Sequence, residues 1–244
     1  METISVPERL HGYPGVAFGG YVAGLLAARV ADADAVRVDF RRPVPTGTAV
    51  RPVAAEGGGV SLLDAADTLL AAASPARAPG GAVPQVPQVP SWDEASKAAE
   101  AFRADPPQGQ ADCFGCGLDR TPATGLRLHC GRVPGRDIVA AAWTPGPELA
   151  GPDGMLPPEL VWGALDCPGN AAGRLLDHRP AGAVTAALTA RLLRPVPAAG
   201  GGGLISYAWL LGGEGRTYTA GTALATAEGE LCAVAEALWV QPRG

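Results

Sequence analysis

Asp166 is the residue of this chain whose surroundings best suit acid–base chemistry. It directly follows the apolar run Leu160 to Leu165. A carboxylate in apolar surroundings has a raised pKa unless it is paired, and a raised pKa suits a general base that works near neutral pH. Pro168 would free the Ala164 carbonyl and kink a helix beside the acid. Alternatively, Asp166 caps a new helix that has Pro168 in its first turn.

Cys113 and Cys116 form a Cys-x-x-Cys pattern that suggests a zinc site, with His129 and Cys130 as further ligands. A second closely spaced cysteine pair is absent. His129 and Cys130 are neighbours and would point to opposite faces of a strand. We therefore expect no metal. With five cysteines, an odd number, in a chain of this size, we also expect reduced thiols and no disulfide framework.

Cys167 adjoins Asp166 and offers an alternative nucleophile. A cysteine nucleophile needs a basic partner, and the three histidines of the chain are His11, His129 and His178. None of them lies in a recognisable local motif. The expected role of Cys167 is therefore that of a buried core thiol.

The composition is that of a globular protein with few charges. Of 244 residues, 47% are apolar and 18% are charged, and the net charge is −5 with Lys97 as the only lysine. The clustered Lys and Arg that bind nucleic acid are therefore missing. The longest apolar stretch, 16–28, is shorter than the roughly 20 residues of a membrane span. No basic segment precedes an apolar core at 1–5, so we expect a cytoplasmic protein with no nucleic-acid or membrane partner.

The tetrapeptide Arg-Pro-Val-Pro occurs twice, at Arg42 to Pro45 and at Arg194 to Pro197. Each copy closes an apolar strand-like run that follows a Gly- and Ala-rich helical stretch. The repeat indicates one fold unit written twice. Between the copies lies a Pro-spaced segment, 84–90, which we expect to be semi-rigid. Ser91 and Glu94 then form the pattern of a capping box, for a helix through about Arg103.

These features divide the chain into a first unit at 1–78, a linker at 79–110 and a second unit at 111–244. Each unit shows a helix followed by strands, which suggests an antiparallel sheet curled around a buried apolar helix. The order within the second unit also places two strands before its helix. The expected helices are 19–31 and 158–176, and the expected strands are 36–41, 49–55, 60–73 with a break near Asp67, 125–132, 138–143, 183–193, 204–211, 216–227 and 230–240, with a hairpin turn at Glu228-Gly229.

Several short motifs carry a family resemblance. The segments 18–22 (Phe-Gly-Gly-Tyr-Val) and 40–44 (Phe-Arg-Arg-Pro-Val) resemble the first half of the double hot-dog acyl-CoA thioesterases, the thioesterase II type. The segment 113–117 (Cys-Phe-Gly-Cys-Gly), followed by Gly125-Leu126, resembles the start of single hot-dog thioesterases of the phenylacetate pathway type. The resemblance covers most of the chain. It implies an α+β double hot-dog fold, in which each half is an antiparallel sheet wrapped around a central helix.

The resemblance also implies site residues. The family places a helix Asp, a strand Thr or Ser and a final-strand Gln around a water in the second half. These positions fall on Asp166, Thr185 and Glu236 in this chain. Glu236 departs from the family, because an ionised Glu cannot donate a hydrogen bond; either it is protonated beside Asp166 or the roles have changed. In the first half the position of Asp166 falls on Ala27, so that half is expected to be structural or to cover the substrate.

The expected function is hydrolysis of an acyl-CoA or acyl-carrier thioester by water that Asp166 and Thr185 activate and Glu236 holds. No cofactor is expected, and association into a homodimer is optional because two copies already pair within the chain. One rival is a non-catalytic acyl-CoA or acyl-carrier binding protein, and another is a structural protein without an acyl-sized pocket at Asp166. The expected substrate-binding residues are Gly19, Gly20, Tyr21, Trp162 and Gly163.

Overall fold

The computed structural model describes residues 2–77, 86–106, 111–198 and 202–243. Its helices are α1 (Gly19–Ala27), α2 (Trp92–Ala104), α3 (Pro158–Ala164) and α4 (Cys167–Leu176). Its strands are β1 (Ile4–Ser5), β2 (His11–Tyr13), β3 (Val16–Ala17), β4 (Ala35–Phe40), β5 (Ala49–Ala54), β6 (Val60–Leu63), β7 (Leu69–Ala76), β8 (Gly131–Arg132), β9 (Val139–Trp143), β10 (Val184–Leu192), β11 (Leu204–Glu214), β12 (Thr217–Thr226) and β13 (Leu231–Val240).

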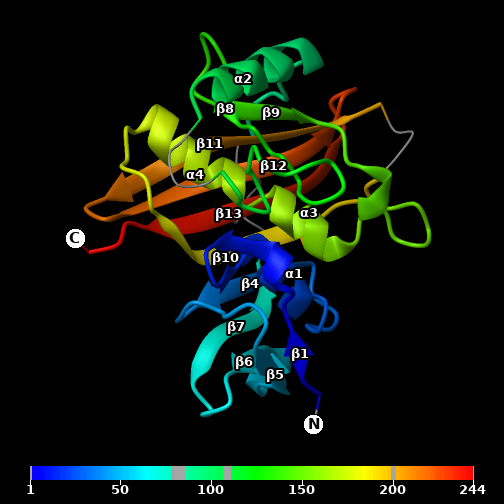
Figure 1. Ribbon diagram of the computed structural model, residues 1–244, viewed down its shortest axis with the longest axis vertical. Helices are drawn as coiled ribbons and strands as arrows, with labels where there is room; N and C mark the ends of the chain where they lie inside the picture. The colour runs from blue at the N-terminus through cyan, green and yellow to red at the C-terminus, as the bar shows by residue number, and fades with distance from the viewer. Residues whose placement is uncertain (1, 78–85, 107–110, 199–201, 244) are drawn as a thin grey trace.

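Among the described residues, one 11-stranded antiparallel sheet runs through the molecule in the order β1-β5-β6-β7-β4-β10-β13-β12-β11-β9-β8. The halves meet where β4 pairs with β10, with Val36 opposite Ala190 and Asp39 opposite Ala187. Figure 1 shows these two strands at the middle of the molecule, between the strands of the first half and those of the second. Strands β2 and β3 form a separate ribbon. The two halves thus share one hydrogen-bonded sheet.

The two Arg-Pro-Val-Pro segments make equivalent hydrogen bonds. The Val44 carbonyl accepts from the Ala17 N–H at 2.8 Å, just before α1, and the Val196 carbonyl accepts from the Leu156 N–H at 2.7 Å, just before α3. Each tetrapeptide therefore ties the end of a central strand to the start of a central helix. The similarity of the two copies in sequence is matched by a similarity in their contacts.

The central helices are shorter than the sequence predicts. Helix α1 ends at Ala27 rather than at residue 31, and the single helix expected at 158–176 is two helices separated by Leu165 and Asp166. Helix α1 packs closely on α3 through two glycines. A Cβ on Gly20 would lie 2.8 Å from Gly163 Cα, and one on Gly24 would lie 2.3 Å from Glu159 Cα. Two backbones can approach this closely only where side chains are absent.

Most of the strands lie where the sequence predicts them, and the long run at 60–73 does break near Asp67, which has a φ of +59°. The turn at Glu228-Gly229 is also confirmed. The strand expected at 125–132 is wrong, since only Gly131–Arg132 is strand. The preceding residues instead hydrogen-bond to the loop 113–117, with Leu126 N–H donating to the Phe114 carbonyl at 2.8 Å. This pairing occupies the backbone groups that a strand would have used.

Helix α2 begins with the predicted capping box. Glu94 N–H donates to Ser91 Oγ at 3.2 Å, and Ser91 N–H donates to Glu94 Oε2 at 2.7 Å. Two alanines of α2, Ala95 and Ala98, are buried in a cluster with Tyr207 of the sheet. Helix α2 is therefore packed against the second half. The first residues of the Pro-spaced segment, 84 and 85, lie outside the described residues.

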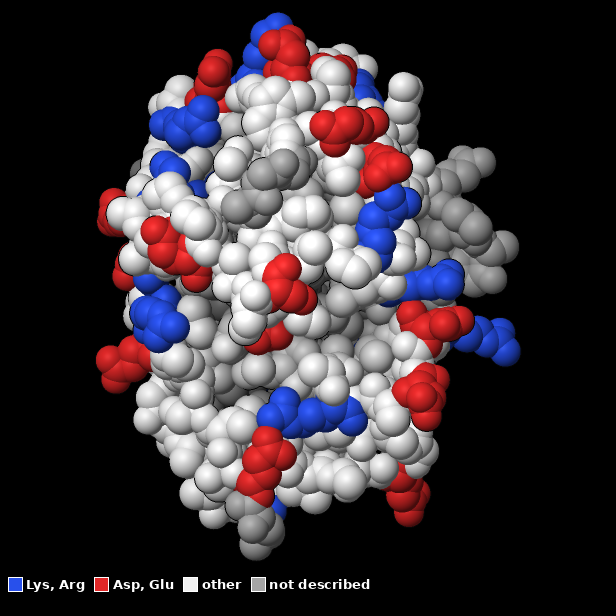
Figure 2. Space-filling view, turned by 90° about the vertical axis from the view of Figure 1, so that its right-hand side faces the viewer, with Lys and Arg blue, Asp and Glu red and all other residues white. Residues whose placement is uncertain are grey.

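Charges are dispersed over the face shown in Figure 2, where basic and acidic side chains are scattered among uncharged residues. This face offers no continuous basic surface of the kind that nucleic acid needs. Within the described part of the chain, every helix is too short or too polar to cross a membrane.

His129 is buried beneath α2 as a neutral ring. It is 3% exposed, it stacks on Phe102 with ring centroids 5.3 Å apart, and its Nε2 has no partner among the described residues. Burial lowers the pKa of His129 to about 4, helped by the charges of Arg127 and Arg103. The folded protein therefore takes up a proton here at lower pH than the unfolded chain does.

We expect His129 to make the fold acid-sensitive. Its contribution to the free energy of unfolding is complete above its ordinary pKa of about 6.5 and is lost as the pH falls toward 4, because protons then favour the unfolded chain. Urea unfolding at pH 7 and pH 5 measures this loss. A His129→Phe variant keeps an aromatic ring against Phe102 and should lose less stability over that interval than the parent. An equal loss in both proteins would contradict the expectation.

A second prediction concerns the α1–α3 contact. In an open helix Gly24→Ala would stabilise by about 1 kcal/mol through propensity. Here the new methyl group meets the backbone of Glu159, so we expect a net destabilisation of about 1–3 kcal/mol and a lower Tm. Gly163→Ala is the control, because the atoms nearest to its methyl group are side-chain carbons of Leu126 and Phe18, at 3.0 and 3.1 Å, and not backbone atoms. A higher Tm for Gly24→Ala would refute the packing argument.

Candidate active site

Asp166 lies at the junction of α3 and α4, in the N-cap position of α4 with Pro168 in the first turn. Its carboxylate makes no capping hydrogen bond. Asp166 Oδ2 instead accepts from the Gly20 N–H of α1 at 2.7 Å, and Oδ1 accepts from Thr185 Oγ1 of β10 at 2.7 Å. A new helix does begin after Asp166, as one of the two alternatives from the sequence predicted. The side chain of Asp166, however, hydrogen-bonds to α1 and β10 and does not cap that helix.

The carboxyl group of Asp166 is removed from solvent, with the residue 2% exposed. Burial raises its pKa to about 6, while the hydrogen bonds from Thr185 and Gly20 act in the opposite direction. Above that pH the group is a charged acceptor whose two oxygens are held by donors from two other elements. Such a group can take a proton from a water placed beside it.

Thr185 reaches Asp166 because of the register of β10. It lies opposite Trp239 of β13, and the pairing shifts by one residue before Ala187. Trp239 faces the helices, since a Cβ on Gly169 of α4 would lie 2.5 Å from Trp239 Nε1. Thr185, the second residue of β10, therefore lies on the helix side of the sheet, where its hydroxyl can donate to Asp166.

Glu236 is not brought to Asp166. It is three residues before Trp239 on a regular stretch of β13, and strand side chains alternate between faces, so Glu236 points to the opposite face of the sheet. Its neighbours across the strands are Thr189 and Gly221, and its charge acts on Arg37 of β4. The sequence count placed a third polar group at the site; the strand's alternation puts Glu236 away from it.

A cavity of about 510 Å³ opens beside Asp166 and Thr185, between the two halves. Its walls are mainly apolar and aromatic, and they come from β2 and β3, the segment 40–44, α2, the loop 113–116, α4 and the ends of β10 and β13. The lining residues are Gly12, Tyr13, Val16, Ala17, Phe18, Gly19, Phe40, Arg41, Arg42, Pro43, Val44, Phe102, Cys113, Cys116, Leu128, Asp166, Cys167, Asn170, Ala171, Arg174, Ala183, Val184, Thr185, Ala186, Trp239 and Val240.

Of the five expected substrate-binding residues, only Gly19 lines the cavity. Gly20 contributes its N–H to Asp166. Trp162, Gly163 and Tyr21 do not line the cavity. Trp162 is a core side chain at 3% exposure, Gly163 packs against Phe18, and Tyr21 is half-buried. Burial, with the nearby charge of Glu159, raises the pKa of Tyr21.

Asn170 is a polar cavity residue that the sequence analysis missed. It lies one helical turn after Asp166 on α4, and its Nδ2 donates to the Ala183 carbonyl at 3.2 Å. The spacing of four residues from Asp166 was the available signal, because residues i and i+4 share a helix face. Three arginines, Arg41, Arg42 and Arg174, also line the cavity.

Cys113, Cys116 and Cys167 gather at the cavity wall, with their sulfur atoms all within 4.8 Å of one another. His129 and Cys130, the ligands that the sequence suggested, are not part of this group. Hydrogen bonds with the Cys116 and Cys167 thiols lower the pKa of Cys113, and hydrogen bonds with Cys113 and Cys116 raise the pKa of Cys167. Cys167 is therefore not an activated nucleophile, and no described histidine hydrogen-bonds to it.

No known protein-family model and no curated protein matches the sequence. Solved structures do match. A tesB protein of Mycobacterium avium subspecies paratuberculosis superposes with a TM-score of 0.60 and 16% identity, over 94% of this chain and 89% of that one. The acyl-CoA thioesterase II TesB2 of Mycobacterium marinum gives 0.60 and 15%, over 99% and 93%. The chain has the fold of the thioesterase II proteins.

A structure from Thermobifida fusca assigned as thioesterase II agrees, with a TM-score of 0.59 and 14% identity over 99% of this chain and 92% of that one. The resemblance seen in the sequence is thereby confirmed at the level of the hot-dog thioesterase fold. The match extends over nearly the full length of both chains, so the thioesterase II fold accounts for both halves of the sheet.

Proposed function

We propose that this protein hydrolyses an acyl-CoA or acyl-carrier thioester, using Asp166 and Thr185 to activate water. The observation that carries the proposal is the hydrogen-bonded group of Asp166, Thr185 and the Gly20 N–H, which adjoins a 510 Å³ cavity. A cavity of this size at Asp166 speaks against a purely structural role. The acyl-CoA thioesterase named among the matched structures supports the reaction class.

The architecture proposed with this function is a double hot-dog, with units at 1–78 and 111–244 and a linker at 79–110. The shared sheet and the equivalent hydrogen bonds of the two tetrapeptides support it. The two units have unequal roles. Ala27 ends α1 where the second unit has Asp166, so the first unit supplies the Gly20 N–H and part of the cavity wall but no carboxylate.

In the proposed mechanism, a water beside Asp166 attacks the thioester carbonyl carbon and gives its proton to the carboxylate. The tetrahedral intermediate then expels the thiol sulfur, which takes that proton as the C–S bond breaks. Thr185 and the Gly20 N–H hold the carboxylate in one orientation. Asn170 takes the water-holding role that the sequence assigned to Glu236, because its amide lies on the cavity and can accept and donate.

The developing negative charge on the carbonyl oxygen requires a hydrogen-bond donor, and we assign the Gly19 N–H. Gly19 is the first residue of α1, where backbone N–H groups have no intrahelical partner and the helix dipole favours negative charge. The neighbouring Gly20 N–H is already occupied by Asp166. A Cβ on Gly19 would lie 3.1 Å from Asp166 Oδ2, so this backbone borders the reaction site directly.

The cavity also suits the two ends of such a substrate. Phe18, Phe40 and Phe102 offer an apolar wall for an acyl group, while arginines at the cavity lining can bind the phosphates of CoA or of a carrier's pantetheine arm. Arg42 is exposed, and Arg174 is half-buried. The apolar wall and the arginines together favour a long thioester over a small one.

The test is hydrolysis of a panel of acyl-CoA thioesters. Asp166→Asn keeps the size of the side chain but removes the base, so we expect kcat to fall about 10²–10⁴-fold. Thr185→Val should lower kcat to a smaller degree by freeing the carboxylate. Glu236→Gln is the matched control and should retain the parental rate, since Glu236 lies on the other face of the sheet.

Two results would overturn the assignment. An Asp166→Asn protein with the parental rate would remove Asp166 from the mechanism. Binding of acyl-CoA by the parent without turnover would instead favour the rival hypothesis, a non-catalytic binding protein. The position of Glu236 away from Asp166 also favours that rival.

A second prediction isolates the Gly19 N–H. Gly19→Pro removes this donor at the first helical position, where proline is otherwise tolerated. Gly19→Ala adds a similar Cβ beside Asp166 but keeps the N–H. We expect kcat of the proline variant to be about 10²–10³-fold below that of the alanine variant. Equal kcat values in the two variants would place the oxyanion donor elsewhere.

A further inference from the structure

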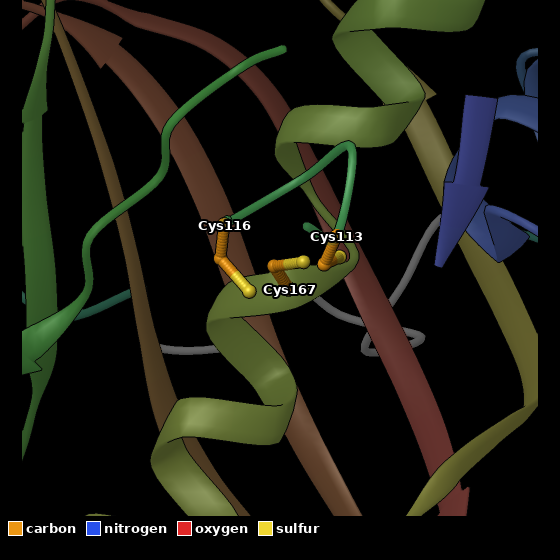
Figure 3. A group of neighbouring side chains, drawn as sticks. All are labelled: Cys113, Cys116 and Cys167. Carbon is orange, nitrogen blue, oxygen red and sulfur yellow. The ribbon is translucent and has the colours of Figure 1, made fainter. Parts of the chain in front are cut away.

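We propose that Cys113, Cys116 and Cys167 bind a zinc ion at the cavity wall, a site that is independent of the proposed hydrolysis. The three side chains come from two separate elements. Figure 3 shows Cys113 and Cys116 reaching from their loop toward Cys167, which is the first residue of α4. A site of this kind cross-links the loop 113–117 to the helix that follows Asp166.

The spacing of the sulfur atoms fits a tetrahedral ion. Zn–S bonds of about 2.3 Å place two sulfurs of a tetrahedron about 3.8 Å apart. The three sulfurs lie within 4.8 Å of one another, so each pair needs to close by no more than about 1 Å. Small rotations of the cysteine side chains provide such a change.

The loop is shaped to hold a thiolate. The backbone N–H groups of Gly115 and Cys116 both hydrogen-bond to the sulfur of Cys113. Gly115 crosses directly over Cys167, where a Cβ would lie 2.4 Å from Cys167 Sγ. The loop is anchored from both sides, with Phe114 N–H donating to the His11 carbonyl at 2.9 Å and Leu126 N–H donating to the Phe114 carbonyl at 2.8 Å. The backbone that carries Cys113 and Cys116 is thus held in place beside Cys167.

The chemistry of the donor set points to zinc. Three thiolates crowded together repel one another, and a soft divalent cation removes that repulsion; thiolates select zinc over hard cations such as Mg²⁺. Asp166 is not part of the group of ligand atoms that lie within 4.8 Å of one another. All three cysteines line the cavity, so the fourth position faces it and is open to water or to a thiol.

The first experiment measures metal directly. Protein purified under reducing conditions, stripped with a chelator and titrated with Zn²⁺ should bind one ion per chain and show a higher Tm when loaded. Titration with Co²⁺ should produce the thiolate-to-cobalt charge-transfer absorption of a tetrahedral site. These readouts use the parent protein and do not depend on hydrolysis, so they separate this proposal from the proposed function.

The second experiment assigns the ligands. Cys113→Ser, Cys116→Ser and Cys167→Ser should each weaken Zn²⁺ binding by more than about 100-fold. Removal of a residue that only hydrogen-bonds to a metal ligand already costs up to about 100-fold in affinity, and these variants remove a ligand itself. Cys232→Ser is the matched control. Cys232 is also a buried free thiol, but it is the second residue of β13 and is not part of the three-cysteine group. The Cys232→Ser variant should therefore bind zinc as the parent does.

Two outcomes would overturn the proposal. Reduced parent protein that binds neither Zn²⁺ nor Co²⁺ more tightly than the Cys113→Ser variant has no such site. A disulfide between two of the three cysteines in protein isolated without reductant, together with no zinc binding after reduction, would show that the group pairs as a disulfide and not around a metal.

Discussion

The buried carboxylate of Asp166 is the constraint on which the rest of this structure depends. A charged group at 2% exposure is costly unless its oxygens are hydrogen-bonded. Both donors come from outside its own helix, one from α1 in the first half and one from β10. The position of α1 against the junction of α3 and α4 is therefore coupled to the state of a single side chain.

The contact between the helices is what allows that hydrogen bond. Gly20 and Gly24 bring the backbone of α1 against α3, at distances that a methyl group would prevent. The same approach puts Gly19 at the cavity, so one close packing arrangement both holds the Asp166 carboxylate and borders the cavity. The pairing of β4 with β10 then joins both halves into a single sheet around this centre. The two tetrapeptides make similar contacts, but the second half has Asp166 after its central helix α3, whereas the first half has Ala27 at the end of α1.

The connecting segment and the start of the second half also contribute residues to the cavity wall. The loop 113–117 brings two cysteines to the start of α4, and Phe102 of α2 reaches the cavity while its ring stacks on His129. The wall of the cavity is therefore assembled from the connecting segment as well as from the sheet. This arrangement links the stability of α2 to the shape of the pocket.

Much of the framework was readable from the sequence alone, because it depends on local patterns. The apolar run before Asp166, the capping box of Ser91 and Glu94, the turn at Gly229 and the repeated tetrapeptide all act within short stretches of chain. The tertiary structure alone decided which distant residues meet. It turned Glu236 to the far face through strand alternation and brought Cys167 to Cys113 and Cys116. These outcomes depend on register and on close backbone packing, which pair residues far apart in the chain and leave no mark in a local window.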